Sequence, residues 1–339
     1  MTKILVTDGT GYIGSHTVVE LQNSGYEVVI IDNLSNSYIQ VLDRIEKITG
    51  IRPEFENIDC VNYKALSRLF DKHSDIKAII HFAASKAVGE SVEKPLMYYS
   101  NNLISLVNLL QLMQSYKVQN LVFSSSCTVY GQPDELPVTE NATIKPALSP
   151  YRNTKQIGEE IINDTIYANA GMNSIILRYF NPIGAHPTAE IGELPNGIPN
   201  NLLPFVTQTA IGLRKELQVF GTDYDTADGS CIRDYINVVD LAKAHVIAVQ
   251  RLLNKQLKQG VETFNLGTGR GLSVLEIIET FERVTGVKVP YKIVGRREGD
   301  IEKVWANTWL IQTMYWVGKP LKQLKIRFAA PGHGSKNYS

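Results

Sequence analysis

Short apolar runs alternate with longer amphipathic stretches through the first half of this 339-residue chain. The short runs are rich in β-branched residues and leucine, and they lie at residues 4–7, 28–31, 79–82 and 121–123. Runs that are apolar throughout are typical of strands buried on both faces of a parallel sheet. Residues 12–24 and 38–49 have helical periodicity and are expected to form crossover helices. The pattern predicts an α/β fold with a doubly wound parallel sheet.

The pattern loosens after about residue 180. Loops rich in proline, glycine and asparagine follow, for example at residues 181–184 and 194–199. Such loops commonly carry recognition residues. We therefore expect residues 1–180 to form the sheet domain, with the cofactor and the catalytic groups. Residues 181–308 are expected to form a smaller, loop-rich α/β domain that binds the substrate.

The first predicted strand runs into a glycine-rich turn, Asp8-Gly9-Thr10-Gly11-Tyr12-Ile13-Gly14. Gly11 allows the backbone to approach a pyrophosphate, and Gly14 allows the following helix to pack on the strand. The amides at the helix start, at Tyr12 and Ile13, can donate hydrogen bonds to phosphate oxygens. A strand, this turn and a helix in that order predict a Rossmann-type dinucleotide site.

Acidic residues at the ends of the second and third strands refine the choice of cofactor. Asp32 has the spacing expected of an acid that hydrogen-bonds the adenosine ribose, and its charge disfavours a 2′-phosphate. The sequence therefore predicts NAD rather than NADP. Asp59 ends a third strand and either binds the adenine amino group or is a solvated loop acid. We include it in the predicted NAD site together with Asn33 and Cys60, which follow the two acids.

Residues 124–131 and the segment Tyr151-Arg152-Asn153-Thr154-Lys155 together describe a hydride-transfer site. A tyrosine with a pKa of about 10 is a poor base at neutral pH, but a lysine one helical turn later lies on the same face and stabilises the phenolate. Ser126, at the C-terminal end of a strand, can hold the same hydroxyl and relay its proton. We expect Ser126, Tyr151 and Lys155 to be catalytic, with Tyr151 as the general base for an alcohol.

Composition narrows the class of ligand. Basic and acidic residues balance at 34 each, so no global field attracts nucleic acid or an anionic membrane. No apolar run approaches the roughly 20 residues that cross a bilayer, and the N-terminus does not read as a signal peptide, so we expect a cytoplasmic protein with a small ligand. The three cysteines Cys60, Cys127 and Cys231 are widely separated, and the six histidines are scattered, so neither disulfides nor a metal site is expected.

Further segments match one enzyme family. They are the helix start Gly-Tyr-Ile-Gly-Ser-His and residues 81–91, 98–102, 149–151, 178–187, 233–236 and 296–300. With these motifs, the chain resembles the UDP-glucose 4-epimerases of the extended short-chain dehydrogenase superfamily from residue 3 to about residue 307. The resemblance implies reversible inversion at C4 of a UDP-hexose through a 4-keto intermediate, with hydride transferred to bound NAD and back. It also implies a homodimer through helices near residues 95–116 and 152–170.

The resemblance assigns further residues to the two ligands. Phe82, Ala84, Lys86, Asn101 and Tyr179 are expected to line the NAD site together with Tyr151 and Lys155, and Lys155 also holds the nicotinamide ribose. Ser126 contacts the sugar, and the remaining substrate residues are Asn181, Asn201, Leu202, Val219, Phe220, Arg233, Tyr235, Arg297, Asp300 and Val304. Guanidinium groups suit a diphosphate, and we expect one of Arg296 and Arg297 to be merely solvated.

Two related reactions are less well supported. Sugar 4,6-dehydratases carry an acid in the serine strand, and Ser126-Cys127-Thr128 offers none. Cys127 lies where ketosugar 3,5-epimerase-reductases use a cysteine for acid-base chemistry, but the simpler interpretation is a small packing residue in place of the usual alanine. Another NAD-dependent nucleotide-sugar epimerase remains an alternative enzyme.

Several departures bear on activity. Asp8 replaces the first glycine of the turn and brings a carboxylate to the pyrophosphate, while Ser105 and Arg152 replace glycines expected on helices.

Residues 309–339 do not continue the family pattern. Reverse translation from Trp309, shifted by two bases, restores the Val-Leu-Gly motif at the family's spacing, so we hypothesise that a frameshift produced this tail. The alternative origin of the tail is ordinary divergence. For the chain as a whole, Asp8 and the tail favour a rival function, that of a catalytically impaired nucleotide-sugar-binding remnant or regulator.

Val304 bears on substrate size. The resemblance places it in the sugar pocket, where a bulky tyrosine in some family members restricts the C2 substituent. Valine is smaller, so we expect UDP-N-acetylhexosamines to be accepted as well. The alternative is that Val304 simply packs a strand, as buried apolar residues usually do.

Overall fold

The computed structural model describes residues 1–169, 171–297 and 300–309. These residues form two compact units, each assembled from separate stretches of chain. The first comprises residues 1–129, 146–179 and 238–264, and the second comprises the described residues between these stretches and from Asn265 to Trp309. The chain passes from the first unit to the second at residue 180, which is also where the sequence pattern changes. The hypothesised frameshifted tail lies, apart from Trp309, outside the described residues.

A seven-stranded sheet with the order β10-β6-β5-β4-β1-β2-β3 is the centre of the first unit. Its strands are β1 (Lys3–Thr7), β2 (Glu27–Asp32), β3 (Glu54–Asn57), β4 (Ile76–His81), β5 (Asn120–Ser126), β6 (Asn173–Tyr179) and β10 (Val261–Leu266). The pairings from β3 through β6 are parallel. The predicted doubly wound sheet is confirmed, and its strand order reverses beside β1, the point where such sheets bind ligands.

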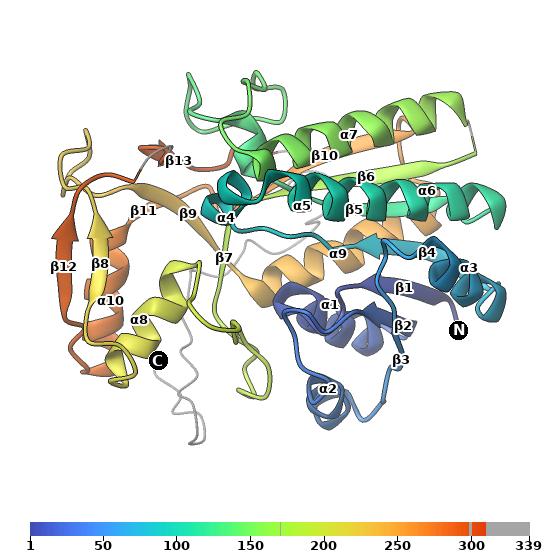
Figure 1. Cartoon of the computed structure of the whole chain (residues 1–339), viewed down its shortest axis with the longest axis horizontal. Coiled ribbons are helices and arrows are strands. Elements are labelled where there is room, and N and C mark those ends of the chain that lie inside the picture. Colours follow the sequence, from blue (N-terminus) through green and yellow to red (C-terminus); the bar gives the residue numbers. More distant parts are fainter. Residues whose placement is uncertain (170, 298–299, 310–339) are drawn as a thin grey trace. The chain divides into compact units, whose positions relative to one another are not determined.

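Helices cover both faces of this sheet (Figure 1). One face carries α1 (Tyr12–Asn23), α2 (Val41–Thr49) and α9 (Val238–Leu253), with α1 packed against both of the others. The other face carries α3 (Tyr63–Lys72), α4 (Val88–Glu93), α5 (Pro95–Tyr99), α6 (Ser105–Ser115) and α7 (Pro150–Ala168). A π-helix, η1 (Ser100–Ile104), joins α5 to α6, and a 3₁₀ helix, η2 (Cys127–Tyr130), follows β5. Ser105 and Arg152 lie on helices as expected.

Burial of the strands on both faces of the sheet explains why their sequences are apolar throughout. Ile4, Leu5 and Val6 of β1 have no exposed surface. Full burial of such a side chain stabilises the fold by about 1.5–3 kcal/mol. Because helices cover both faces, neighbouring strand residues are buried together rather than alternately.

Two element ends differ from the prediction for local reasons. The helix expected from residue 38 begins at Val41, because Ser37 turns back and donates a hydrogen bond to Asp32 (3.0 Å). The third strand ends at Asn57 rather than at Asp59. Asp59 instead accepts the backbone N–H of Val61 (2.9 Å), a short-range bond that turns the chain into a loop.

The second unit is built around β9 (Ile232–Asn237). Strands β7 (Asn181–Ile183), β11 (Gly271–Ser273) and β13 (Lys303–Val304) pair with β9, and β8 (Leu217–Phe220) pairs with β12 (Tyr291–Val294). Helices α8 (Leu202–Ala210) and α10 (Val274–Thr285) complete the unit, and a capping box formed by Ser273 and Glu276 opens α10. Val206, Leu217 and Phe281 are buried in its core.

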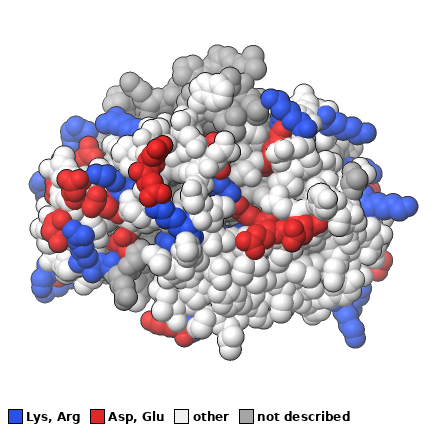
Figure 2. Space-filling view, turned by 90° about the horizontal axis from the view of Figure 1, so that it is seen from above, with Lys and Arg blue, Asp and Glu red and all other residues white. Residues whose placement is uncertain are grey.

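The surface carries charges of both signs. Figure 2 shows acidic and basic side chains interspersed among uncharged residues on the face in view. Among the described residues, no helix is both long and apolar enough to cross a membrane, and no group of three or more histidine, cysteine or acidic residues could hold a metal ion.

Candidate active site

The glycine-rich turn between β1 and α1 has room for little more than hydrogen at two positions. A Cβ on Gly14 would lie 2.1 Å from the carbonyl oxygen of Asp8, and a Cβ on Gly9 would lie 2.7 Å from Ile30. Gly11 is the N-cap of α1 and has no side chain to accept hydrogen bonds from the first turn. The first amides of a helix have no carbonyl of their own helix to bond, and this geometry suits an anion, as in dinucleotide sites.

Asp8 departs from this arrangement. Its φ of 54° lies in the left-handed region that glycine adopts without penalty. Its carboxyl group folds over Gly11, with both oxygens 2.7–2.8 Å from the position that a Cβ there would take. Burial, and then the charge of Asp32, raise the pKa of Asp8 to about 8. At neutral pH the carboxyl is therefore mostly protonated, so the negative charge expected at this turn is largely removed.

Asp32 at the end of β2 is held by four donors. One carboxylate oxygen accepts the backbone N–H (3.2 Å) and hydroxyl (2.5 Å) of Thr10, and the other accepts the N–H of Leu34 (2.8 Å) and the hydroxyl of Ser37 (3.0 Å). Sequence reasoning found Asp32 but missed Thr10 and Ser37. The only sequence signal for these two residues was that Thr10 lies in the glycine-rich turn and that Ser37 lies five residues after Asp32.

The predicted adenine residues come together. The side-chain amide of Asn33 donates to Asp59 over 3.1 Å. Cys60 is buried beside them, and its carbonyl accepts a 3.0 Å bond from Asn108 on α6. Burial and the negative charges of Asp59, Asp8 and Asp32 raise the pKa of the Cys60 thiol.

The loop after β4 is held by hydrogen bonds to Thr7 on β1. The hydroxyl of Thr7 lies 3.0 Å from His81 Nδ1 and accepts the N–H groups of Phe82 (3.1 Å) and Ala83 (3.0 Å). Phe82 packs on the ring of His245, with 4.8 Å between centroids. Ala84 and Lys86 follow in the same loop, and the charge of Lys86 acts on Asp8.

A pair of asparagines on the π-helix η1 ties this loop to α7. The amide nitrogen of Asn101 donates to Ser85 Oγ (3.2 Å). Asn102 accepts the N–H of Ser85 (2.8 Å) and donates to the hydroxyl of Thr154 (3.0 Å). Sequence reasoning assigned Asn101 and missed Asn102, although the Asn-Asn pair was the signal. Single π-helical turns inside α-helices are frequent at functional sites.

The three predicted catalytic residues lie together. Strand β5 ends at Ser126, and Ser149 caps α7 by accepting the N–H of Arg152 (3.3 Å). Tyr151, on the first turn of α7, lies near enough to the Ser126 hydroxyl for that group to lower its pKa. One turn later, Lys155 donates from Nζ to the carbonyl oxygen of Ser124 (2.6 Å).

The pKa values of these groups differ from the expectation. Burial raises the pKa of Tyr151 to about 12, against the opposing influence of the Ser126 hydroxyl. Burial lowers the pKa of Lys155 to about 8, while the charges of Glu159 and Asp8 oppose that shift. Lys155 is not among the groups that act on the pKa of Tyr151, and its Nζ is bound to the Ser124 carbonyl. The expected lowering of the Tyr151 pKa by Lys155 is thus absent in this structure.

Two sets of buried contacts join strands β5 and β6 to helices α7 and α9. Glu159 on α7 forms a two-pronged ion pair with Arg178 on β6, with N–O distances of 3.0 and 2.6 Å, and accepts the hydroxyl of Ser125. The hydroxyl of Tyr179 bonds the ring of His245 on α9, and burial raises the pKa of Tyr179. Of these residues, only Tyr179 was assigned from the sequence.

In the second unit, Asp300 holds both predicted substrate arginines. Its carboxylate lies 2.8 Å from Arg297 and 3.6 Å from Arg233, and Arg297 lies over the ring of Phe220 at 5.4 Å. Arg233 also donates to the backbone carbonyl of Ile232 (2.9 Å). Two guanidinium groups therefore converge on one carboxylate, and an aromatic ring packs on one of them.

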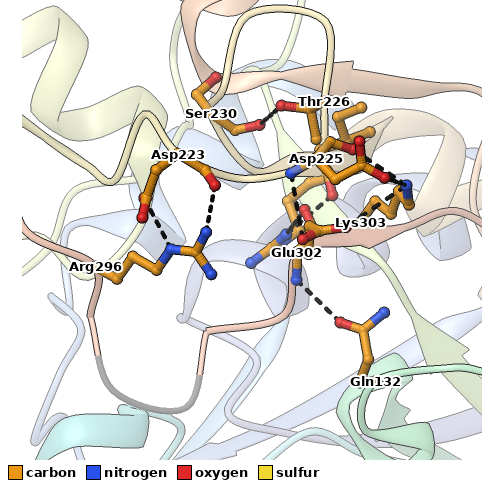
Figure 3. Close-up of polar contacts among 10 residues, drawn as sticks. Gln132, Asp223, Asp225, Thr226, Ser230, Arg296, Glu302 and Lys303 are labelled. Atoms are coloured by element: carbon orange, nitrogen blue, oxygen red, sulfur yellow. Dashed lines mark hydrogen bonds and ion pairs between the residues drawn. The ribbon is translucent and has the colours of Figure 1, made fainter.

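Figure 3 shows the polar contacts that fix the neighbouring strand β13. Arg296 is held by Asp223 (2.8 Å) and lies over the ring of Tyr224 (4.1 Å). Glu302 donates its N–H to Gln132 (3.0 Å). Val304 then follows in register with Arg233 and is buried.

The other predicted substrate residues are more dispersed. Asn201 precedes α8 and donates to Glu193 (2.5 Å), and Asn181 on β7 lies in register with Tyr235. The side chains of Leu202, Val219 and Tyr235 pack in the apolar cores of the second unit.

Comparisons with known proteins agree with this geometry. Residues 4–267 match the model of the NAD dependent epimerase/dehydratase family. A UDP-glucose 4-epimerase from Mus musculus is 51% identical over 313 residues, which are 91% of this chain and 89% of the relative. A UDP-glucose 4-epimerase structure from Stenotrophomonas maltophila, with bound NAD and formylated UDP-arabinopyranose, has a TM-score of 0.89 and 48% identity over 93% of both chains. That from Bifidobacterium longum, in complex with NAD+ and UDP, has a TM-score of 0.89 and 45% identity, covering 93% of this chain and 92% of the other.

Proposed function

Because this chain belongs to the NAD dependent epimerase/dehydratase family, we propose that it interconverts UDP-glucose and UDP-galactose by inversion at C4. The observation that carries the proposal is that Tyr151 and Lys155 lie one helical turn apart on α7, with Lys155 bonded to the end of β5, where Ser126 acts on the pKa of Tyr151. Relatives that share about half of the sequence are UDP-glucose 4-epimerases, and the similar structures contain NAD with UDP or a UDP-sugar.

The first unit provides the residues that would hold NAD. The turn at Gly11 to Gly14 offers amides to the pyrophosphate, and Asp32 suits the adenosine ribose, with Asn33, Asp59 and Cys60 beside it. Phe82, Ala84, Lys86, Asn101 and Tyr179 complete the proposed NAD site. Bound NAD supplies a reversible acceptor for the hydride on C4. The residues fit this cofactor, with Asp8 as the single mismatch.

The catalytic residues handle the proton of the 4-hydroxyl. Tyr151 takes this proton, directly or through Ser126, and returns it when the hydride is delivered to the other face of the 4-keto sugar. A pKa of about 12 leaves Tyr151 protonated at neutral pH, so it needs a nearby positive charge to act as a base. Lys155 is placed one turn away to supply one, after its Nζ leaves the Ser124 carbonyl.

The second unit would bind the UDP part of the substrate. Arg233 and Arg297 offer forked donors to the diphosphate, with Asp300 holding them in place. Asn181, Asn201, Leu202, Val219, Phe220 and Tyr235 are proposed to surround the nucleotide. Val304 would line the sugar, and its small side chain supports acceptance of N-acetylated UDP-hexosamines alongside the unsubstituted sugars.

A direct assay tests the proposal. The protein is purified gently, its NAD is released by denaturation and quantified, and conversion of UDP-galactose to UDP-glucose is followed. We expect bound NAD and interconversion. Protein that binds UDP but neither carries NAD nor converts the sugar would favour the rival role of a nucleotide-sugar-binding remnant or regulator, for which Asp8 is the supporting observation.

Two properties extend the proposal. A homodimer through helices near residues 95–116 and 152–170 is supported by exposed apolar side chains on those segments, with Leu96 81%, Ile104 42% and Tyr167 94% exposed. Light scattering after size exclusion tests it, and a monomer at all concentrations would contradict it.

A cytoplasmic location is supported by the three cysteines, none of which forms a disulfide, because unpaired thiols of this kind are typical of a reducing compartment.

A further inference from the structure

Three elements of the proposed active site meet at one buried carboxylate. Glu159 lies on α7, one helical turn after Lys155, and only 5% of its surface is exposed. Its two oxygens accept Nε (3.0 Å) and Nη2 (2.6 Å) of Arg178 on β6. One of these oxygens also accepts the hydroxyl of Ser125 on β5. The carboxylate thus joins the helix to two neighbouring strands of the sheet.

The partners of Glu159 on the two strands adjoin residues of the proposed active site. Ser125 directly precedes Ser126, and Arg178 directly precedes Tyr179. The two strands are paired in parallel up to these last residues. A change at Glu159 should therefore be passed to the strand ends at which Ser126 and Tyr179 lie.

A second bond between α7 and β5 has to break in the proposed reaction. Lys155 donates from Nζ to the Ser124 carbonyl (2.6 Å), and it leaves that carbonyl to lend its charge to Tyr151. The contact of Glu159 with Ser125 does not involve Lys155, so it persists when Nζ moves. Glu159 can therefore keep the helix against the strand while Lys155 acts.

Glu159 also places a negative charge near Lys155, because side chains four residues apart on a helix are neighbours. Burial lowers the pKa of Lys155 to about 8, and the charges of Glu159 and then Asp8 oppose this shift. The nearby His81, at the end of β4, is neutral because burial lowers its pKa to about 3, and Tyr151 is neutral at pH 7 as well. Asp8 is itself mostly protonated at pH 7, so Glu159 is the stronger of the two influences that favour the charged lysine.

We propose that Glu159 is a positioning residue: it keeps α7 in place against β5 while Lys155 moves, and it supplies a negative charge one helical turn from Lys155. It acts through Ser125, Arg178 and Lys155 rather than by contact with the substrate or the cofactor. This inference rests on the proposed function and adds to it a residue that the sequence analysis did not assign.

A second buried ion pair in the same unit is a matched control. Arg251 on α9 donates to both oxygens of Glu262 on β10, over 2.6 and 2.9 Å, and the two side chains are 12% and 7% exposed. Like Glu159, Glu262 accepts a third donor, here the backbone N–H of Lys258 (2.9 Å). The two carboxylates have similar surroundings, but Glu262 joins α9 to β10 instead of α7 to β5.

Glu159→Gln and Glu262→Gln each remove one charge from such a pair, so both should lower the melting temperature. Only Glu159→Gln should lower kcat for UDP-galactose, by at least about tenfold, while KM changes less than about threefold. Steady-state kinetics at a temperature where both variants are folded measure the effect. Equal losses of kcat in the two variants, or an unchanged kcat in folded Glu159→Gln, would overturn the proposal.

The pH dependence of kcat separates positioning from a general loss of stability. Lys155 supplies its charge only while protonated, so kcat should fall as the pH rises through its pKa. Loss of the Glu159 charge favours the neutral amine, so in Glu159→Gln this fall should occur about one pH unit lower. Glu262→Gln should keep the parental profile. A parental profile in Glu159→Gln would also contradict the proposal.

Ser125→Ala is a milder variant that serves if Glu159→Gln does not fold. It removes the bond to β5 and leaves the ion pair with Arg178 intact. Its control is Ser174→Ala on β6, because Ser174 is fully buried and its hydroxyl has no hydrogen-bond partner. Ser125→Ala should lower kcat about fivefold, the effect of one lost hydrogen bond, and Ser174→Ala should not. Equal kcat values of the two serine variants would refute the role of the contact with β5.

Hydrogen–deuterium exchange tests the contact without turnover. The peptide that covers residues 150–158 should exchange faster in Glu159→Gln than in the parent protein and in Glu262→Gln. Equal exchange in all three would show that Glu159 does not keep α7 in place. An inactive parent protein would contradict the proposed function, while the exchange rates would still decide whether Glu159 positions the helix.

Discussion

The two units differ in how deeply they bury the charged groups that have proposed functions. In the first, the groups with proposed chemical roles are buried, and burial moves the pKa of Tyr151 to about 12 and that of Lys155 to about 8. In the second, the two arginines proposed to bind a charged ligand are more exposed, with the side chain of Arg233 16% and that of Arg297 60% exposed, and both are held by Asp300. Burial strengthens charge interactions and solvent screens them. Proton chemistry is therefore assigned to the buried unit, and capture of a charged ligand to the exposed one.

The sharpest test of this division is Tyr151→Phe. Since the hydroxyl acts in proton transfer and not in anchoring, kcat should fall by several orders of magnitude while the affinity for UDP stays nearly unchanged. Steady-state kinetics and calorimetry with UDP measure the two effects. Tyr167→Phe, at an exposed position of the same helix, is the matched control. If Tyr151→Phe retains near-parental turnover, Tyr151 is not the base.

Arg233→Ala should have the complementary effect in the second unit. A lost charged hydrogen bond costs about 1.5–3 kcal/mol, so KM for UDP-galactose should rise about 10- to 150-fold with a smaller change in kcat. Arg296→Ala is the matched control, because Arg296 is already committed to Asp223 and Tyr224. Equal effects of the two variants on KM would show that the structure misassigns which arginine meets the diphosphate.

Asp8 tests whether a buried charge controls the cofactor. With a pKa of about 8, its carboxyl is neutral at pH 7 and becomes negative as the pH rises through 8. Repulsion of the NAD pyrophosphate should then weaken NAD binding by up to about tenfold between pH 7 and pH 9. Asp8→Gly should raise the NAD content and remove this pH dependence, and Asp8→Asn should remove it without changing the shape. Equal NAD content of the parent and Asp8→Gly at both pH values would show that Asp8 does not face the pyrophosphate.

Val304→Tyr should have the smallest effect. If volume at this position admits a C2 substituent, the tyrosine should slow conversion of UDP-N-acetylglucosamine about tenfold while leaving UDP-glucose less affected. Specificity constants for both sugars, measured in parallel, give the comparison. A variant that slows both by the same factor would point to disturbed strand packing, since Val304 is buried in β13.

The sequence predicted the sheet and the glycine-rich turn beside it because local patterns encode them. Gly11, Gly14 and Asp32 are tied to strand ends, where backbone geometry dictates which residue fits. The four donors around Asp32 could not be read in the same way, since hydroxyl residues are common near turns. Asn102 was equally hidden, because its partners Ser85 and Thr154 come from distant parts of the chain.

The protonation states were the least predictable part of the site. Spacing places Lys155 one turn after Tyr151, but spacing carries no information about desolvation. Burial raises the pKa of Tyr151 rather than lowering it, and it neutralises most of the charge expected on Asp8. Such shifts depend on the whole surroundings of a group, which only the folded structure supplies.

The division of each unit into separate stretches of chain has a consequence for biosynthesis. Helix α9 and strand β10, which complete the first unit, come from residues beyond 237, long after Tyr151 and Lys155 have been made. As the protein leaves the ribosome, the nascent chain therefore carries its catalytic residues before it can cover α1 with α9 or close the edge of β6. A message cut short after residue 180 would encode every catalytic group and still yield an unfinished sheet, which is a substrate for chaperones and proteases rather than an enzyme.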